Sequence, residues 1–122
     1  LVGPPGTGKT LTAKAVAGLD LGQSVCVKDQ AVLAVEAIEG TDACVRRAGD
    51  HAAGFTLAKV AKPRQDLRFD VPVVGLRTVE ALVAARGAVL AVEAGKTLFF
   101  DREEFLKRAD AAGLVVLGVK DL

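Results

Sequence analysis

Short apolar runs alternate with mixed, amphipathic stretches along most of this chain. Residues 24–29 and 31–37 are rich in Val, and the polar pair Asp29 and Gln30 separates them. Two such runs around a two-residue turn are typical of a β-hairpin. The same pattern of short apolar runs predicts four further strands, over residues 55–61, 88–92, 96–100 and 114–119.

Helices are predicted between these strands. A first helix follows the loop at residues 39–42, and it runs to about Ala53. Thr41 or Asp42 is expected to cap it, because a side-chain oxygen at this position accepts a hydrogen bond from a free N–H of the first turn. A second helix is predicted over residues 78–86, ended by Gly87.

The last third of the chain repeats this order. Asp101 is expected to cap a helix over residues 102–112, and Gly113 ends it.

Residues 62–77 are predicted to be irregular, since they are charged and contain proline. Strands that alternate with helices of about ten residues predict an α/β fold. We expect a single small domain with a mixed sheet and flanking helices.

Composition narrows the class of protein. The 122 residues suffice for one core, and 51% of them are hydrophobic, which excludes a disordered tail. The net charge of +1 gives no reason to expect nucleic acid as a partner. Cys26 and Cys44 are too few for a disulfide framework, so reduced thiols in the cytoplasm are the expectation. No apolar run approaches the length of a membrane span.

One apolar hexapeptide occurs twice. Residues 32–37 and 89–94 share the sequence Val-Leu-Ala-Val-Glu-Ala, and each copy leads into a loop with Gly and Thr. Coincidence is one explanation, because these residue types are common here. The other is that two strands present Glu and loop N–H groups at one edge of a sheet, where α/β proteins bind ligands.

A phosphate-binding motif lies at the start of the chain. Gly3 and Gly8, followed by Lys9 and Thr10, have the spacing of a P-loop, in which backbone N–H groups and the Lys hold phosphates and Thr binds Mg²⁺. Residues 1–18 resemble the P-loop of FtsH-type AAA proteases. Only two residues precede the motif, however, whereas a P-loop follows a strand. We therefore expect residues 1–18 to be foreign to a domain formed by residues 19–122.

Basic and acidic side chains are densest between residues 59 and 77. Lys and Arg suit a diphosphate, and two carboxylates suit Mg²⁺. Together they are the groups needed to hydrolyse a phosphoanhydride, although a solvated loop with surface ion pairs would look the same. The polar residues of this segment are Lys59, Lys62, Arg64, Gln65, Asp66, Arg68, Asp70 and Arg77.

Four signatures in this order resemble the C-terminal domain of LpxI-type UDP-2,3-diacylglucosamine diphosphatases. They are Asp-Leu-Gly-Gln-Ser-Val at residues 20–25, Val-Glu-Ala-Ile-Glu-Gly-Thr-Asp-Ala at 35–43, the Lys-x-x-Lys-Pro-x-Gln-Asp-x-Arg-x-Asp-x-Pro pattern at 59–72, and Ala-Val-Glu-Ala-Gly-Lys-Thr at 91–97. The resemblance implies a Mg²⁺-dependent hydrolase of lipid A biosynthesis. Its substrate is UDP-2,3-diacylglucosamine, and its products are UMP and 2,3-diacylglucosamine 1-phosphate.

The resemblance also implies which residues form the site. Asp66 and Asp70 are expected to be catalytic and to hold the metal. The expected substrate ligands are Lys59, Lys62, Gln65, Arg68, Glu39, Gly40, Thr41, Asp42, Glu93, Lys96 and Thr97.

The implied partners follow from the same resemblance. The resemblance implies that the family has an N-terminal domain, with the site between the two domains, and we expect this chain to lack that domain. We expect a cytoplasmic protein that contacts the inner membrane peripherally, and a homodimer is compatible with the sequence. Two alternatives stay open: an ATP-binding P-loop fragment, and a non-catalytic module that binds a phosphorylated partner.

Overall fold

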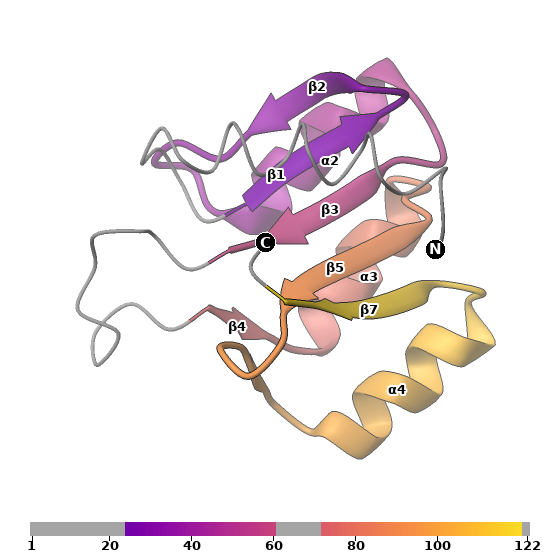
Figure 1. Cartoon of the computed structure of the whole chain (residues 1–122). Coiled ribbons are helices and arrows are strands. Elements are labelled where there is room, and N and C mark those ends of the chain that lie inside the picture. Colours follow the sequence, from indigo (N-terminus) through magenta and orange to yellow (C-terminus); the bar gives the residue numbers. More distant parts are fainter. Residues whose placement is uncertain (1–23, 61–71, 121–122) are drawn as a thin grey trace.

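A computed structural model describes residues 24–60 and 72–120, and these form one small α/β domain around a five-stranded mixed sheet (Figure 1). The strand order is β2-β1-β3-β5-β7, and β4 pairs with β6 in a separate two-stranded sheet. The elements are β1 (Ser24–Lys28), β2 (Ala31–Val35), α2 (Thr41–His51), β3 (Thr56–Lys59), β4 (Val73–Val74), α3 (Leu76–Ala84), β5 (Val89–Glu93), β6 (Leu98–Phe99), α4 (Arg102–Ala111) and β7 (Val115–Val119).

The first two strands form the predicted hairpin. Asp29 and Gln30 both have a positive φ, 51° and 66°, which is the backbone of a two-residue turn that matches the twist of the strands. The register shifts between Cys26 and Val27, where the pairing of β1 moves from Ala34 to Val32. Leu33 is therefore the extra residue of a bulge.

Strand direction sets the place of the site. β1 is antiparallel to both β2 and β3, whereas β3, β5 and β7 are parallel to one another. The strands β2, β3, β5 and β7 therefore all end at one edge of the sheet, and β1 begins there (Figure 1). The two copies of the repeated hexapeptide lie in β2 and β5, so both lead to this carboxyl edge.

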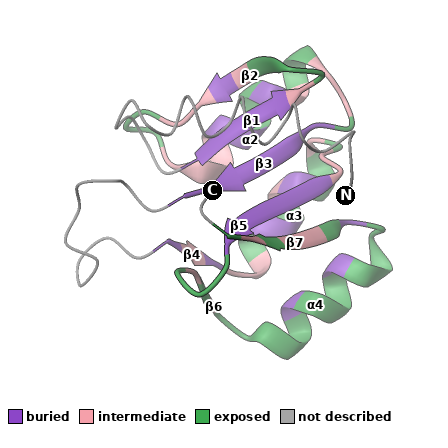
Figure 2. Cartoon of the chain, in the orientation of Figure 1, coloured by how far each residue is buried: buried purple, intermediate pink, exposed green. Residues whose placement is uncertain are grey.

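The core lies between the sheet and its helices. Alternate residues of the central strands, among them Cys26, Leu57 and Leu90, face a cluster to which α2, α3 and α4 each contribute. The intervening residues, including Val25 and Ala58, form a smaller cluster on the opposite face. Figure 2 shows that β3 and β5 are buried along their length, and β1 is buried except at its last residue, Lys28. Both cysteines are buried and free.

The predicted helix caps are wrong in detail. The N-cap of α2 is Gly40, at φ 95°, and no side chain caps this helix, so neither Thr41 nor Asp42 does so. Thr41 lies one position too late, and its hydroxyl bonds elsewhere. Asp101 is at the N-cap of α4 but makes no side-chain cap, and its φ of 49° is left-handed rather than the extended backbone typical of a capping residue.

The segment before α3 is more regular than predicted. Val73 and Val74 form β4, which pairs with β6, and α3 begins at Leu76, inside the segment that the sequence suggested was irregular. The pattern failed here because a two-residue strand depends on its partner rather than on its own sequence. Gly113, at φ 73°, follows α4 as predicted.

Gly87 follows α3 for a reason other than the predicted one. Arg86 takes the left-handed conformation, at φ 66°, rather than Gly87. A Cβ on Gly87 would lie 2.6 Å from Leu82 Cδ2 and 3.2 Å from the Phe55 ring. Close packing therefore requires the glycine at this position.

Candidate functional site

A polar cluster lies at the carboxyl edge of the sheet, where four elements meet. Ser24 begins β1 and pairs in register with Lys59, the last residue of β3. Glu36 follows β2, and its N–H donates to the Ser24 carbonyl at 2.9 Å. Thr41 is the first residue of α2. Antiparallel pairing and one loop thus bring together residues that are up to 35 positions apart in the sequence.

The Thr41 hydroxyl is the centre of this cluster. Its oxygen lies 3.0 Å from Ser24 Oγ and 3.0 Å from Lys59 Nζ, which donates to it. It also lies 3.4 Å from Glu36 Oε1. Ser24 is fully buried and Lys59 is only 6% exposed, which is unusual for a lysine. The structure therefore holds a nearly buried cation at the edge where α/β folds bind ligands.

Burial changes the pKa of Lys59. Desolvation lowers the pKa of Lys59 below its ordinary value, because a charged amine is less stable away from water. The nearby carboxylates of Glu36 and Asp42 raise the pKa part of the way back. An arriving phosphate would also raise the pKa of Lys59, because a negative charge close by stabilises the ammonium form.

Glu39 and Gly40 lie in the loop before α2. Arg47 donates to both oxygens of Glu39 and, at 2.8 Å, to the Val35 carbonyl. The Glu39 carboxylate is therefore used to close the loop between β2 and α2. This hydrogen bonding lowers the pKa of Glu39. The positive φ of Gly40 suits glycine, and a Cβ there would meet nothing within 4 Å.

A second predicted group lies in the turn after β5. The Lys96 ammonium is 3.5 Å from a carboxylate oxygen of Glu93, and the Thr97 hydroxyl donates to the Glu93 carbonyl at 3.2 Å. Gly95, at φ 78°, allows this tight turn. Since β5 neighbours β3, the turn lies one strand away from Lys59. Glu93 is buried and shares a sheet face with Ala91, whereas Lys59 shares the other face with Leu57.

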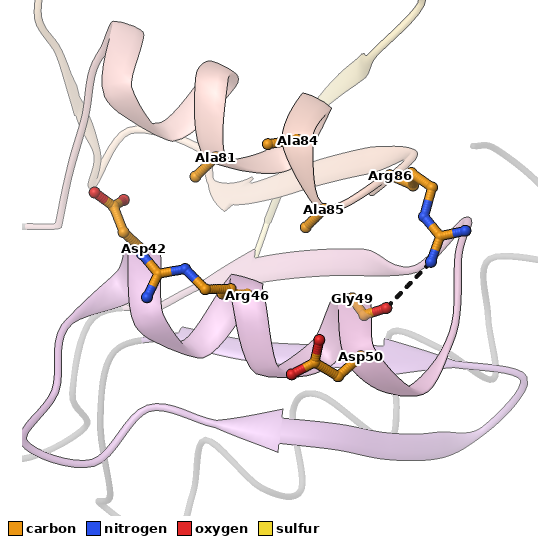
Figure 3. Close-up of a pocket in the computed structure, with 8 residues that line it drawn as sticks. All are labelled: Asp42, Arg46, Gly49, Asp50, Ala81, Ala84, Ala85 and Arg86. Atoms are coloured by element: carbon orange, nitrogen blue, oxygen red, sulfur yellow. Dashed lines mark hydrogen bonds between the residues drawn. The ribbon is translucent and has the colours of Figure 1, made fainter.

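The helices α2 and α3 enclose a groove of about 420 Å³ (Figure 3). Alanines of α3 face acidic and basic residues of α2 across it, and Arg86 donates to the Gly49 carbonyl at 3.3 Å. Asp42 stands at one end, and its carboxylate pairs with Arg77 at 3.3 Å. Of the predicted site residues that the structure describes, only Asp42 lines this groove. The mixed charges do not indicate a particular ligand.

Several predicted residues lie outside the described ranges. They are Asp66 and Asp70, the ligands Lys62, Gln65 and Arg68, and the P-loop residues Gly3, Gly8, Lys9 and Thr10. Within residues 24–60 and 72–120, no three His, Cys, Asp or Glu side chains gather as a metal site would require.

Sequence reasoning missed three residues of the site. Ser24 lacked a neighbouring base in the sequence, and it acquires its partners only through strand pairing. Glu36 and Arg47 are ordinary charged residues by pattern. The Glu that both copies of the hexapeptide contain was the one signal that pointed to Glu36.

Comparison with known protein families gives a match over most of the chain. The family model of the LpxI C-terminal domain matches residues 8–117. The chain belongs to the LpxI C-terminal domain family. The predicted boundary between residues 18 and 19 stays a prediction, since it lies outside the described residues.

A curated relative supports the assignment. The UDP-2,3-diacylglucosamine pyrophosphatase LpxI of Caulobacter vibrioides is 41% identical over 116 aligned residues. The alignment covers 88% of this chain and 41% of that protein, so the chain spans about two fifths of the relative's length.

Solved structures resemble the chain only weakly. Two forms of Acinetobacter baumannii RibD give TM-scores of 0.48 and 0.47 at 18% and 19% identity. Each comparison covers 94% of this chain and 35% of the other, and a likeness at this level carries no argument. Within the part of the chain that the structure describes, no helix has both the length and the apolar character to cross a membrane.

Proposed function

We propose that this chain forms the C-terminal part of a hydrolase that cleaves the pyrophosphate of UDP-2,3-diacylglucosamine, in lipid A biosynthesis. The support is the 41% identity to a pyrophosphatase of that name, joined to the buried Lys59 at the carboxyl edge. Water adds to the phosphorus on the sugar side, and the bond from that phosphorus to the bridging oxygen breaks. The products are UMP and 2,3-diacylglucosamine 1-phosphate.

In this proposal Lys59 binds a phosphate oxygen of the substrate. Its ammonium is nearly removed from water, and Coulomb attraction to a phosphate is stronger there than at an exposed site. Two of its three N–H bonds take no partner among the described residues, since Thr41 takes the third. Charge on the diphosphate increases as the bond breaks, so a fixed cation stabilises the transition state.

The other groups of the proposed site lie outside the described residues. No three His, Cys, Asp or Glu side chains gather among the described residues, so Asp66 and Asp70 are proposed to hold Mg²⁺. Lys62, Gln65 and Arg68 are proposed to contact the substrate alongside Lys59. The part of the relatives that this chain does not span is proposed to complete the site, in the cytoplasm at the inner membrane.

The test joins this chain to the N-terminal part of the Caulobacter relative and follows UMP release. Lys59→Met is expected to lower kcat/KM by about 100-fold, the size of effect seen when one group that stabilises developing charge is lost. Lys28→Met is the matched control. Lys28 ends β1 at the opposite edge of the sheet, where it donates to the Ala53 carbonyl. Equal activity of Lys59→Met and Lys28→Met would exclude the role given to Lys59.

A further inference from the structure

The Thr41 hydroxyl has three neighbours but limited hydrogen-bonding capacity. A hydroxyl donates one hydrogen bond and accepts two. Its partners are Ser24 Oγ at 3.0 Å, Lys59 Nζ at 3.0 Å and Glu36 Oε1 at 3.4 Å. Three partners therefore use the whole capacity of this oxygen.

The direction of each bond follows from the chemistry of the partners. The Lys59 ammonium can only donate, and the Glu36 carboxylate can only accept. Thr41 therefore gives its one proton to Glu36. Ser24 must then donate its own proton to Thr41, because Thr41 has none left. The chain of bonds runs from Ser24 through Thr41 to Glu36, with Lys59 as the second donor to Thr41.

This order uses the whole hydrogen-bonding capacity of Thr41, whereas two N–H bonds of the Lys59 ammonium take no partner among the described residues. The sequence suggested Thr41 as a direct ligand of the substrate, but its oxygen has no bond left to make. Lys59 is the last residue of β3, and its side chain lies on the same face of the sheet as that of Leu57. The ammonium then meets a hydroxyl whose own position is fixed from β1 and from the end of β2. Without this contact, the four rotatable bonds of the Lys59 side chain would leave the ammonium mobile.

We propose that Thr41, supported by Ser24 and Glu36, is a positioning residue that holds the Lys59 ammonium where it meets a phosphate of the ligand. This inference deepens the proposed function and rests on it for the identity of the ligand. The holding of the ammonium by Thr41 can be tested without any substrate.

The first experiment measures how fast each lysine of the full chain is acylated, by peptide mass spectrometry. Thr41→Val, which has nearly the same shape, removes the hydroxyl and should raise the acylation rate of Lys59 at least about 10-fold relative to Lys28. Losing a hydrogen bond to a charged group has this size of effect. Thr41→Ser keeps the hydroxyl and should restore the wild-type ratio. Lys28 reports unfolding, since a general loss of structure would raise both rates.

Ser24→Ala tests whether the hydrogen bond from Ser24 to Thr41 helps to hold Lys59, beyond the direct contact between Thr41 and Lys59. It leaves Thr41 without one donor, so Lys59 should become more reactive than in the wild type but less than in Thr41→Val. An unchanged ratio of Lys59 to Lys28 acylation in Thr41→Val overturns the inference, and so does a failure of Thr41→Ser to restore the ratio.

The second experiment uses the joined enzyme. Thr41→Ser should keep kcat/KM within about 3-fold, and Thr41→Val should lower it at least about 10-fold, equivalent to 1.4 kcal/mol. The two ideas fail separately. If Lys59→Met is fully active, the proposed phosphate site is wrong, whatever Thr41 does to acylation. If Lys59→Met is inactive while Thr41→Val matches the wild type, the site stands and the positioning role is overturned.

Discussion

Lys59 shows how much a single residue depends on its surroundings. The chain has sixteen Lys and Arg residues, so residue type alone does not mark Lys59 as part of a site. What marks it is that it is only 6% exposed and donates a hydrogen bond to the Thr41 hydroxyl. A buried charge is unfavourable unless hydrogen bonds and opposite charges support it. Here one hydroxyl and two nearby carboxylates supply that support. Glu39, in contrast, is bound by Arg47 and serves the loop.

The Arg47–Glu39 pair gives a prediction at this scale. Arg47→Ala should raise the pKa of Glu39 back toward its ordinary value of 4.5, because the hydrogen bond from Arg47 is the largest cause of its lowering. The pair's contribution to stability is therefore present above that ordinary value, and it is lost as the pH falls through the lowered pKa. NMR titration of the Glu39 carboxyl measures the shift.

Arg46→Ala is the matched control, since Arg46 is the preceding residue of α2 and does not contact Glu39. An unchanged Glu39 pKa in Arg47→Ala would contradict the assignment. The same result would free the Glu39 carboxylate for the substrate role that the family resemblance implies.

At the scale of elements, glycine sets how closely α2 and α3 approach. A Cβ on Gly49 would lie 2.9 Å from both the Cβ and the carbonyl oxygen of Ala85. The obstacle includes backbone, so relief requires a shift of a helix rather than of a side chain. The pattern of apolar residues placed α2 correctly, but it carries no information about this contact.

Gly49→Ala should therefore destabilise the domain. Replacing glycine by alanine inside a helix normally stabilises it by about 1 kcal/mol. Overpacking costs about 1–3 kcal/mol, so we expect a net loss of about 1 kcal/mol and a fall in Tm of about 4–8 °C. Asp50→Ala, at an exposed position of the same helix, should not lower the Tm. Thermal unfolding followed by circular dichroism distinguishes them, and a higher Tm for Gly49→Ala would show that the helices have room.

At the scale of the whole molecule, the core centres on β3. Leu57 is fully buried in the middle of the sheet and belongs to the cluster that α2, α3 and α4 share. The site residues lie at the end of these same buried strands. The rigidity of the core therefore determines how well Ser24 and Lys59 keep their register at the carboxyl edge.

Leu57→Ala should cost about 2–5 kcal/mol, because it leaves a cavity in a packed core. Leu106→Ala, at a position of α4 that is 40% exposed, should cost much less. Urea unfolding of both variants gives the comparison. If the two changes cost the same, the described sheet is not the main source of stability.

The sequence by itself determined the class of the fold, the family and most of the elements. The apolar runs predict both strands of the hairpin, and residue type predicts the turn at Asp29 and Gln30 and the glycine, Gly113, that follows α4. These features are local, since each depends on residues within a few positions of one another. The four family signatures also depend on residue identity and order alone, and the family comparison confirms the membership they indicate.

Tertiary structure alone decided what the polar residues do. The sequence does not show that Ser24 lies opposite Lys59, because antiparallel pairing between β1 and β3 sets that register. Nor does it show that Thr41 bonds to a lysine rather than capping its helix, since that choice depends on where β3 ends relative to α2. A hydrogen bond acts over about 3 Å, and only the folded chain brings these atoms within that distance.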